Sequence, residues 1–137
     1  MRKLALLIPV NKNKQVLLQH RDSGAPIKPN HWAFFGGHIE SEETPDAAAI
    51  REFKEELQID IKGIIVFFGR YIFDEEWGKV DKNFYIVEID EKQEYLKTLQ
   101  LEGDDLGYFY HADLDNLKIS DIDRIVLDHV HHHKVFN

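Results

Sequence analysis

The stretch that says most about the fold of this chain is GGHIESEETPDAAAIREFKEEL, residues Gly36 to Leu57. It opens on two glycines, it is rich in glutamate, and a lone arginine, Arg51, lies near its end. Thr44 is of a residue type that caps helices well, and Pro45 fits the first helical position because it has no backbone N–H to leave unpaired. The stretch therefore predicts a tight turn, a polar loop and then a helix that runs to about Leu57.

The predicted helix separates its acidic side chains from its apolar ones. At 100° per residue, an acidic face about 100° wide is formed by Glu52, Glu55 and Glu56. An apolar stripe, which faces nearly the other way and should pack on a core, is formed by Ile50, Phe53 and Leu57. Grouped carboxylates repel one another, but hard oxygen ligands in such a group suit Mg²⁺, Mn²⁺ or Ca²⁺. A solvated acidic face is the alternative, and for a helix considered alone it is the commoner case.

Composition limits the partners of this chain. Its 137 residues include 17 basic and 25 acidic side chains, for a net charge of −8, so neither nucleic acid nor an anionic membrane is an expected partner. It has no cysteine, which excludes disulfides, thiolate metal sites and a cysteine nucleophile and suits the cytoplasm. The apolar run Leu4–Val10 is too short for a membrane span, and no small-residue cleavage site follows it. We expect one cytoplasmic domain, residues 1–137.

Apolar and β-branched runs predict strands at Leu4–Val10, Gln15–His20, Trp32–Phe35, Ile64–Phe73, Asn83–Ile89 and Leu106–His111. The first two strands should form a β-hairpin, and residues 74–82, which link the strands Ile64–Phe73 and Asn83–Ile89, should form a long, exposed hairpin. Residues 90–99 fit either a helical turn or a loop. Ser120 opens an approximate capping box and a terminal helix that runs to about Lys134. This order of strands and helices predicts an α+β fold with a mixed β-sheet flanked by helices.

The spacing of glycine and charged residues resembles the Nudix box, the loop–helix–loop signature of the Nudix hydrolase family. Gly37 is followed after five residues by Glu43, and after seven more by the run Arg51-Glu52-Phe53-Lys54-Glu55-Glu56. The box covers residues 37–59. The resemblance implies a Nudix-type α/β/α sandwich, in which the mixed sheet lies between helices.

The chain departs from the box at three positions. Gln58 replaces the last glycine, which ends the helix in the family, so we expect a difference from the family at the helix end. Phe35 stands where a proline is frequent, and Phe53 stands where an aliphatic residue is usual. None of these departures removes a carboxylate.

The resemblance also implies a chemistry. Nudix enzymes hydrolyse a nucleoside diphosphate linked to another moiety, by attack of water on phosphorus with Mg²⁺ or Mn²⁺. By this resemblance the metal ligands are the Gly37 carbonyl, Glu52, Glu55 and Glu56. The residues with catalytic roles are Arg51, Glu55, Glu56 and Glu102. Arg51 would hold the glutamates in place, and Glu43 would support the site from behind them.

The general base stays open between a box glutamate and an acidic residue on a later loop. The segment LEGDDLGYF offers Glu102, Asp104 and Asp105 just before a predicted strand. Glu102 is our choice among the three. The alternative is that EGDD is only a polar turn.

Arg21 and Trp77 are the candidate substrate-binding residues. Arg21 follows the strand QVLLQH, where similar proteins place an arginine that contacts phosphate; a solvent-exposed arginine is the alternative. Trp77 lies in the polar segment 74–82 and is suited to stack on a base, whereas aromatic residues within strands belong more often to a core. His129 and His133 have a spacing that can bind a transition metal, but histidines also sit favourably at a helix C-terminus, and we prefer that interpretation.

Together these features favour a Mg²⁺-dependent, MutT-like Nudix hydrolase, with Mn²⁺ as the other candidate metal. Its substrate would be a nucleoside triphosphate, oxidised and non-standard ones included, and its products the monophosphate and pyrophosphate. Asp74 and Glu75 stand where ADP-ribose enzymes carry a proline, and Glu76 and Trp77 stand where dinucleoside polyphosphate enzymes carry a tyrosine. An ADP-ribose or nucleotide-sugar pyrophosphatase is the alternative, and a non-catalytic nucleotide-sensing domain is the alternative of another class. The resemblance also makes a homodimer a candidate assembly.

Overall fold

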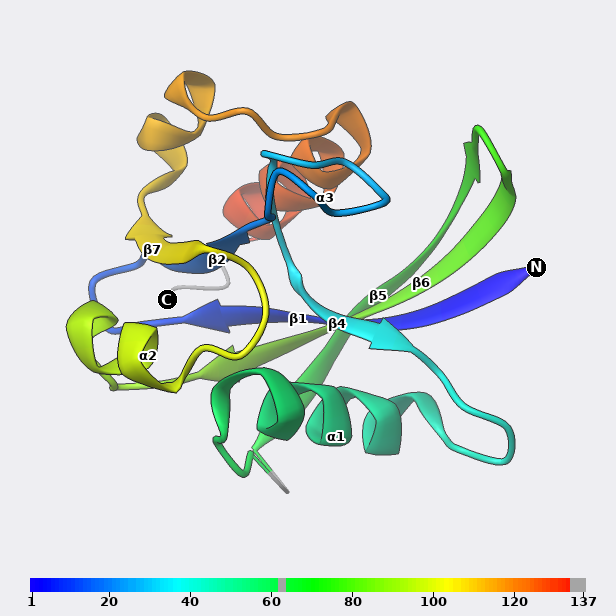
Figure 1. Ribbon diagram of the computed structural model, residues 1–137, viewed down its shortest axis with the longest axis horizontal. Helices are drawn as coiled ribbons and strands as arrows, with labels where there is room; N and C mark the ends of the chain where they lie inside the picture. Colours follow the sequence, from blue (N-terminus) through cyan, green and yellow to red (C-terminus); the bar gives the residue numbers. More distant parts are fainter. Residues whose placement is uncertain (62–63, 134–137) are drawn as a thin grey trace.

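The structure is a computed structural model that describes residues 1–61 and 64–133. Within these residues, seven strands form one mixed sheet that lies between helices (Figure 1). The strands are β1 (Arg2–Val10), β2 (Val16–His20), β3 (Trp32–Ala33), β4 (Phe35–His38), β5 (Ile65–Glu75), β6 (Gly78–Glu88) and β7 (Asp105–Phe109). The helices are α1 (Pro45–Leu57), α2 (Gln93–Leu99) and α3 (Asp121–His132), and a 3₁₀ helix, η1 (His111–Asn116), precedes α3. The predicted α+β class and the sandwich are confirmed.

Strand β1 organises the sheet. It runs parallel to β6 along its whole length, and on its other side it pairs antiparallel with β4 at Leu4–Leu7. The predicted hairpin between β1 and β2 closes only at Val10 and Val16, because β4 occupies the remaining edge of β1. Beyond that point β2 pairs with β3 and β7, and β5 forms the opposite edge of the sheet beside β6.

The two faces of the sheet bury two separate cores. Side chains alternate across a strand, so Ala5 and Leu7 of β1 face α1 and α2, while Leu6 and Ile8 face α3. The α1 side of the core includes Ala48, Ala49, Phe53, Leu57 and Leu96. The α3 side includes Phe34, Phe84, Val126, Leu127 and Val130. This alternation explains why a near-continuous apolar run forms a central strand covered on both faces.

Helix α1 begins and ends where the sequence predicts. The Thr44 hydroxyl accepts a hydrogen bond from the N–H of Ala47 at 3.2 Å, and Pro45 takes the first helical position. At the other end Gln58 adopts the left-handed conformation that the missing glycine would favour (φ 59°), and its N–H donates to the carbonyl of Lys54. Its side chain also donates to the Leu99 carbonyl at 3.1 Å, which ties α1 to α2.

The hairpin expected around residues 74–82 is present, but its strands extend further into this segment than the sequence predicts. Strand β5 extends to Glu75 and β6 already begins at Gly78, so the two strands form a long hairpin with a tight turn. The charged residues of this segment suggest an exposed loop, but they form ion pairs between the two strands. Arg70 binds Asp81 at 2.7 Å, and Lys79 binds Asp74 at 2.9 Å.

Other boundaries differ by a few residues. The ambiguous segment 90–99 contains helix α2, and the last predicted strand ends at Phe109, with His111 in η1. The predicted end of the terminal helix, Lys134, lies outside the described residues. Within the described residues, no helix is long and apolar enough to cross a membrane.

Candidate active site

Glu56 points from α1 into the sheet and not into solvent. Its side chain is almost fully buried, and its Oε1 accepts a hydrogen bond from the N–H of Gly36 on β4 at 2.9 Å. Its Oε2 lies 3.5 Å from Nε2 of Gln19, which donates to the Phe34 carbonyl at 3.0 Å. Burial raises the pKa of Glu56 to about 9; the charges of Glu102 and Glu52 add to this, and the Gly36 N–H opposes it. At neutral pH this carboxyl therefore holds a proton.

Glu52 lies directly against the backbone of Gly37. A Cβ added to Gly37 would lie 2.7 Å from Oε1 of Glu52, so any side chain at this position displaces the carboxylate. Burial raises the pKa of Glu52, and the hydrogen bond from Arg51 opposes this shift. The second glycine of the opening stretch is thus required because a helix carboxylate occupies the space of its side chain.

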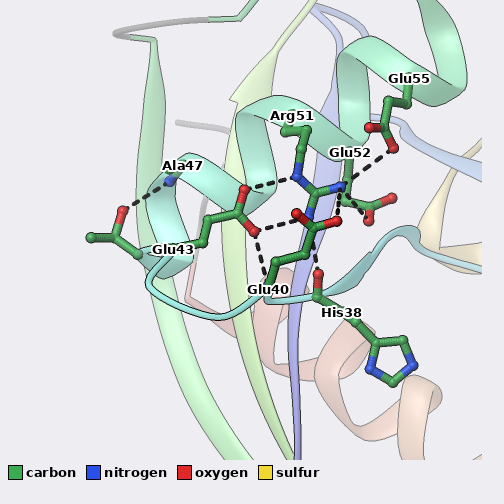
Figure 2. A network of polar contacts seen from close by, with 8 residues as sticks. His38, Glu40, Glu43, Ala47, Arg51, Glu52 and Glu55 are labelled. Carbon is green, nitrogen blue, oxygen red and sulfur yellow. Dashed lines mark hydrogen bonds and ion pairs between the residues drawn. The ribbon is translucent and has the colours of Figure 1, made fainter.

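Arg51 joins the helix to the loop before it (Figure 2). Its Nε and Nη2 donate to the two carboxylate oxygens of Glu43 at 2.8 and 2.9 Å, a paired geometry that favours the charged forms of both groups. Its Nη2 also donates to the His38 carbonyl at 3.0 Å, and its Nη1 reaches Glu52 at 3.0 Å and Glu55 at 3.4 Å. The Arg51 hydrogen bonds hold the pKa of Glu43 at about 2, and Glu43 in turn raises the pKa of Arg51.

The carboxylates form a donor set that fits a divalent cation. Among residues 1–61 and 64–133, no three acidic or histidine side chains converge on one point as a ready-made metal site. Glu52 and the more exposed Glu55 instead contact Arg51, and their negative charges repel one another. The residues available to hold an ion are Glu52, Glu55, Glu56 and the Gly37 carbonyl. A cation beside these hard oxygen groups would relieve the repulsion, which is the ordinary condition for binding Mg²⁺ or Mn²⁺.

The loop before β7 brings one further carboxylate to this group. The charge of Glu102 contributes to the raised pKa values of both Glu52 and Glu56, so Glu102 lies within electrostatic reach of them. The two other acids of the loop have partners elsewhere: Asp104 pairs with His20 at 2.6 Å, and Asp105 pairs with Lys97 at 3.0 Å. Of the three candidates for a general base, Glu102 is the one whose charge acts on both Glu52 and Glu56, and its role as the base stays a prediction.

A cleft of about 260 Å³ opens beside the two glycines. It is lined by the backbone of Gly36 and Gly37 and by cationic side chains, which are Arg2, Arg21, Lys28 and Lys82. Arg21 also braces the loop that follows it, because its Nε donates to the Ile27 carbonyl at 2.8 Å. Trp77 does not line this cleft. It lines a neighbouring depression that shares Ile27, Lys28 and Glu75 with the cleft.

Several residues of the cleft were not predicted from the sequence. Lys82 and Asp123 are buried at its inner end, where Lys82 lies 3.3 Å from Glu75 and 3.8 Å from Asp123. Burial raises the pKa of Asp123. The pairing of β5 with β6 and the packing of α3 against the sheet bring these groups together. Gln19 carries a weak signal, since it is a polar residue that interrupts an apolar strand shortly before its end.

The terminal histidines make local contacts at the end of α3. Nδ1 of His129 lies 2.8 Å from the Tyr71 hydroxyl, and Nδ1 of His133 lies 2.8 Å from the His129 carbonyl. The ring of His131 stacks on that of His111 with centroids 3.9 Å apart. These contacts agree with the interpretation of the cluster as a helix end.

Comparison with known proteins gives the class of the chain. A loop–helix segment places carboxylates against a pair of glycines, at a sheet that lies between helices. The profile of the NUDIX domain matches residues 1–130. The chain belongs to the NUDIX domain family.

Solved structures and one curated relative agree with this assignment. The MutT protein from Methanosarcina mazei Go1 superposes with a TM-score of 0.78 at 16% identity, over 96% of this chain and 94% of that one. The dihydroneopterin triphosphate pyrophosphohydrolase of E. coli gives 0.74 at 18% identity, over 93% and 92%. The NUDIX domain of Shewanella oneidensis NrtR, complexed with ADP ribose, gives 0.76 at 15% identity, over 97% and 88%.

The curated relative is similar over a shorter region. Dihydroneopterin triphosphate diphosphatase from Haemophilus influenzae is 38% identical over 58 residues, which are 42% of this chain and 34% of that protein. The matched region thus spans about a third of that relative's length.

The burial of Glu56 predicts a specific pH dependence of stability. Its pKa is raised from 4.5 to about 9 in the folded protein, so the folded state keeps a proton that the unfolded chain loses in this pH window. The free energy of unfolding should therefore fall as pH rises from about 4.5 to 9. Glu56→Gln, which keeps an acceptor for the Gly36 N–H, should raise the melting temperature of the metal-free protein more at pH 8 than at pH 5.

Thermal unfolding in the presence of a chelator at both pH values measures this effect. The matched control is Glu40→Gln, which removes an exposed carboxylate that lies 3.8 Å from Arg51. An equal effect of Glu56→Gln at the two pH values would contradict the assigned protonation.

Proposed function

We propose that this chain is a Mg²⁺-dependent pyrophosphohydrolase that cleaves a diphosphate linkage in a nucleoside triphosphate and releases the monophosphate and pyrophosphate. The observation that carries the proposal is the placement of Glu52 and Glu56 against Gly37 and Gly36, with Glu55 beside them and raised pKa values at the two buried carboxyls. Mn²⁺ is the other candidate metal. A location in the cytoplasm, and the absence of nucleic-acid and membrane partners, stay predictions from composition.

Each side chain of the site has a role in this proposal. Mg²⁺ held by Glu52, Glu55, Glu56 and the Gly37 carbonyl would neutralise phosphate charge and lower the pKa of the attacking water. Arg51 fixes Glu52 and Glu55 through the contacts described above, and Glu43 fixes Arg51. Glu102 takes the proton of the water whose oxygen bonds to phosphorus as the bridging P–O bond breaks.

The cleft suits an anionic substrate with a polar end group. Arg2, Arg21 and Lys28 provide positive charge beside the glycine backbone, where phosphates would lie. At the inner end, the side chains of Lys82, Glu75 and Asp123 offer donors and acceptors that suit the edge of a heterocyclic base. The proposed stacking role of Trp77 requires that a bound base extend into the neighbouring depression.

The relatives favour a triphosphate substrate, and one of the similar structures supports an alternative. Two of the similar proteins are named for dihydroneopterin triphosphate, and this supports a triphosphate substrate with a bicyclic heterocycle. The NUDIX domain that binds ADP ribose supports the rival, an ADP-ribose or nucleotide-sugar pyrophosphatase, and is equally compatible with a domain that only senses a nucleotide. The complete set of box glutamates in this chain favours turnover over sensing.

A substrate panel with Mg²⁺ tests this function. We expect hydrolysis of nucleoside triphosphates, with oxidised bases and dihydroneopterin triphosphate included, to exceed hydrolysis of ADP-ribose, nucleotide sugars and dinucleoside polyphosphates. Glu55→Gln and Glu56→Gln should each lower kcat by about 100-fold or more. Glu94→Gln, an exposed glutamate on α2, should leave kcat unchanged.

Two results of the panel would contradict the proposal. Nucleotide binding without turnover of any substrate would favour the sensor. Undiminished activity in both variants would show that the metal site lies elsewhere.

We further propose that the chain forms a homodimer through the free edge of β5. Among the described strands β5 pairs only with β6, yet it carries exposed apolar side chains at Val66, Phe67 and Ile72. An apolar edge of this length invites pairing with another strand. In an antiparallel pair of two β5 strands with the two-fold axis at Ile72, Arg70 of each copy lies opposite Asp74 of the other, so the charges of the strand complement themselves.

Solution mass measures the proposed assembly. Light scattering after size exclusion should give twice the monomer mass at high protein concentration, and Ile72→Lys should return the monomer. Ile125→Lys, at an exposed isoleucine on α3, is the matched control and should leave the dimer intact. A monomer mass at every concentration, or a dimer that tolerates Ile72→Lys, would overturn this interface.

A further inference from the structure

The loop that carries Glu102 is tied down on both sides of that residue. Before it, the N–H of Leu101 donates to the carbonyl of Glu56 on α1 at 3.0 Å. After it, the N–H of Asp104 donates to the carbonyl of His20 at the end of β2, also at 3.0 Å. The loop thus spans from the last turn of α1 to the end of β2, and Glu102 lies between the two attachments.

A side-chain contact reinforces the second attachment. Nδ1 of His20 lies 2.6 Å from Oδ1 of Asp104. The His20 ring is held from its other side by Trp32, edge to face with ring centroids 5.0 Å apart. Because the ring has little freedom, it gives the loop a fixed point of attachment.

Gly103 allows the loop to lie this close to β2. Its backbone is left-handed (φ +79°), and a Cβ there would lie 2.7 Å from the carbonyl oxygen of His20. On the far side, Gln100 donates from Nε2 to the Asp105 carbonyl at 2.8 Å and closes the base of the loop. The loop is therefore a tight turn pressed against the strand end, and its shape depends on the contacts at His20.

These attachments hold the backbone on both sides of Glu102 and do not involve its side chain. Glu102 is exposed and lines the same hollow as Gln19 and Arg21. Gln19, next to His20 in β2, contacts Glu56, so the strand end that holds the loop also contacts the buried carboxyl. The charge of Glu102 is felt at Glu52 and Glu56, as described above.

We propose that the pair His20–Asp104 is a clamp that positions Glu102 for proton transfer. His20 and Asp104 are positioning residues: they act through the loop and touch neither the cation site nor the reacting atoms. The inference rests on the proposed function, in which Glu102 is the general base. Its physical reason is that a proton acceptor on an exposed loop loses effectiveness when its position varies by about 1 Å.

The first experiment tests the clamp without any substrate. Hydrogen exchange of residues 101–105 is measured in the intact protein and in Asp104→Ala, which removes the acceptor for His20. Exchange should become at least several-fold faster in the variant. Asp104→Asn keeps an oxygen acceptor for His20 and should restore the protection from exchange. Asp115→Ala removes an exposed acid that pairs with Arg124, and it should not change exchange in residues 101–105. Unchanged exchange in Asp104→Ala would overturn the clamp, whatever the enzyme's activity.

The second experiment tests what the clamp is for. Asp104→Ala should lower kcat by about tenfold and leave KM unchanged, because it disturbs the general base and not the cleft. In a Glu102→Gln background, which has already lost the base, Asp104→Ala should have no further effect on kcat. A loosened loop with unchanged kcat, or effects of the two substitutions that simply multiply, would overturn the positioning role. A protein that hydrolyses nothing would refute the proposed function and leave the exchange result to decide the clamp.

Discussion

The site depends on how closely α1 approaches the backbone of β4. The carboxylate of Glu52 occupies the space that a side chain at Gly37 would need, and Glu56 accepts a hydrogen bond from Gly36. A Cβ on Gly36 would itself collide with the carbonyl of Ala5 on β1, so the sheet requires a glycine there, whereas a side chain at Gly37 would displace the Glu52 carboxylate. This contact converts an ordinary acidic helix face into a group of partly buried carboxylates.

Burying carboxylates costs free energy, and the network around Arg51 offsets part of that cost. Arg51 binds Glu43 with two hydrogen bonds and reaches Glu52, Glu55 and the His38 carbonyl with its remaining donors. Glu56 adjoins Glu52 of this network and retains a proton, because burial raises its pKa. The site therefore combines a protonated carboxyl, Glu56, with charged carboxylates. A bound cation would stabilise the charged form of all of them.

Local signals in the sequence were sufficient for much of the fold. Thr44 and Pro45 define the start of α1, and the alternation of Ala5 to Ile8 anticipates a strand between two cores. The helical spacing also predicts that Glu52, Glu55 and Glu56 share one side of α1, and their role as metal ligands stays a prediction. The sequence could not reveal which way that face points, because the orientation of α1 is set by β4 and β1, strands distant in the sequence.

The failures share the same cause. The charged residues 74–82 look like the exposed connection of a hairpin, whereas the pairing of β5 with β6 makes most of them strand residues and places Asp81 beside Arg70. The inner end of the cleft, at Lys82 and Asp123, is likewise assembled from segments far apart along the chain. His20 and Asp104 gave no local sign of their contact either. Short-range chemistry predicts elements and candidate groups, whereas partners across the sheet require the tertiary structure.

The central claim is that the carboxylates packed on Gly36 and Gly37 form a divalent cation site. This claim is tested most directly by calorimetric titration of the metal-free protein with Mg²⁺ in buffers that differ in ionisation enthalpy. The titration is done at pH 7.5 (about neutral), where Glu56 is protonated. The account predicts binding that releases about one proton per ion, because the ion displaces the proton of Glu56, and weaker binding in Gly37→Ala. Binding without proton release, or no loss of affinity in Gly37→Ala, would contradict it.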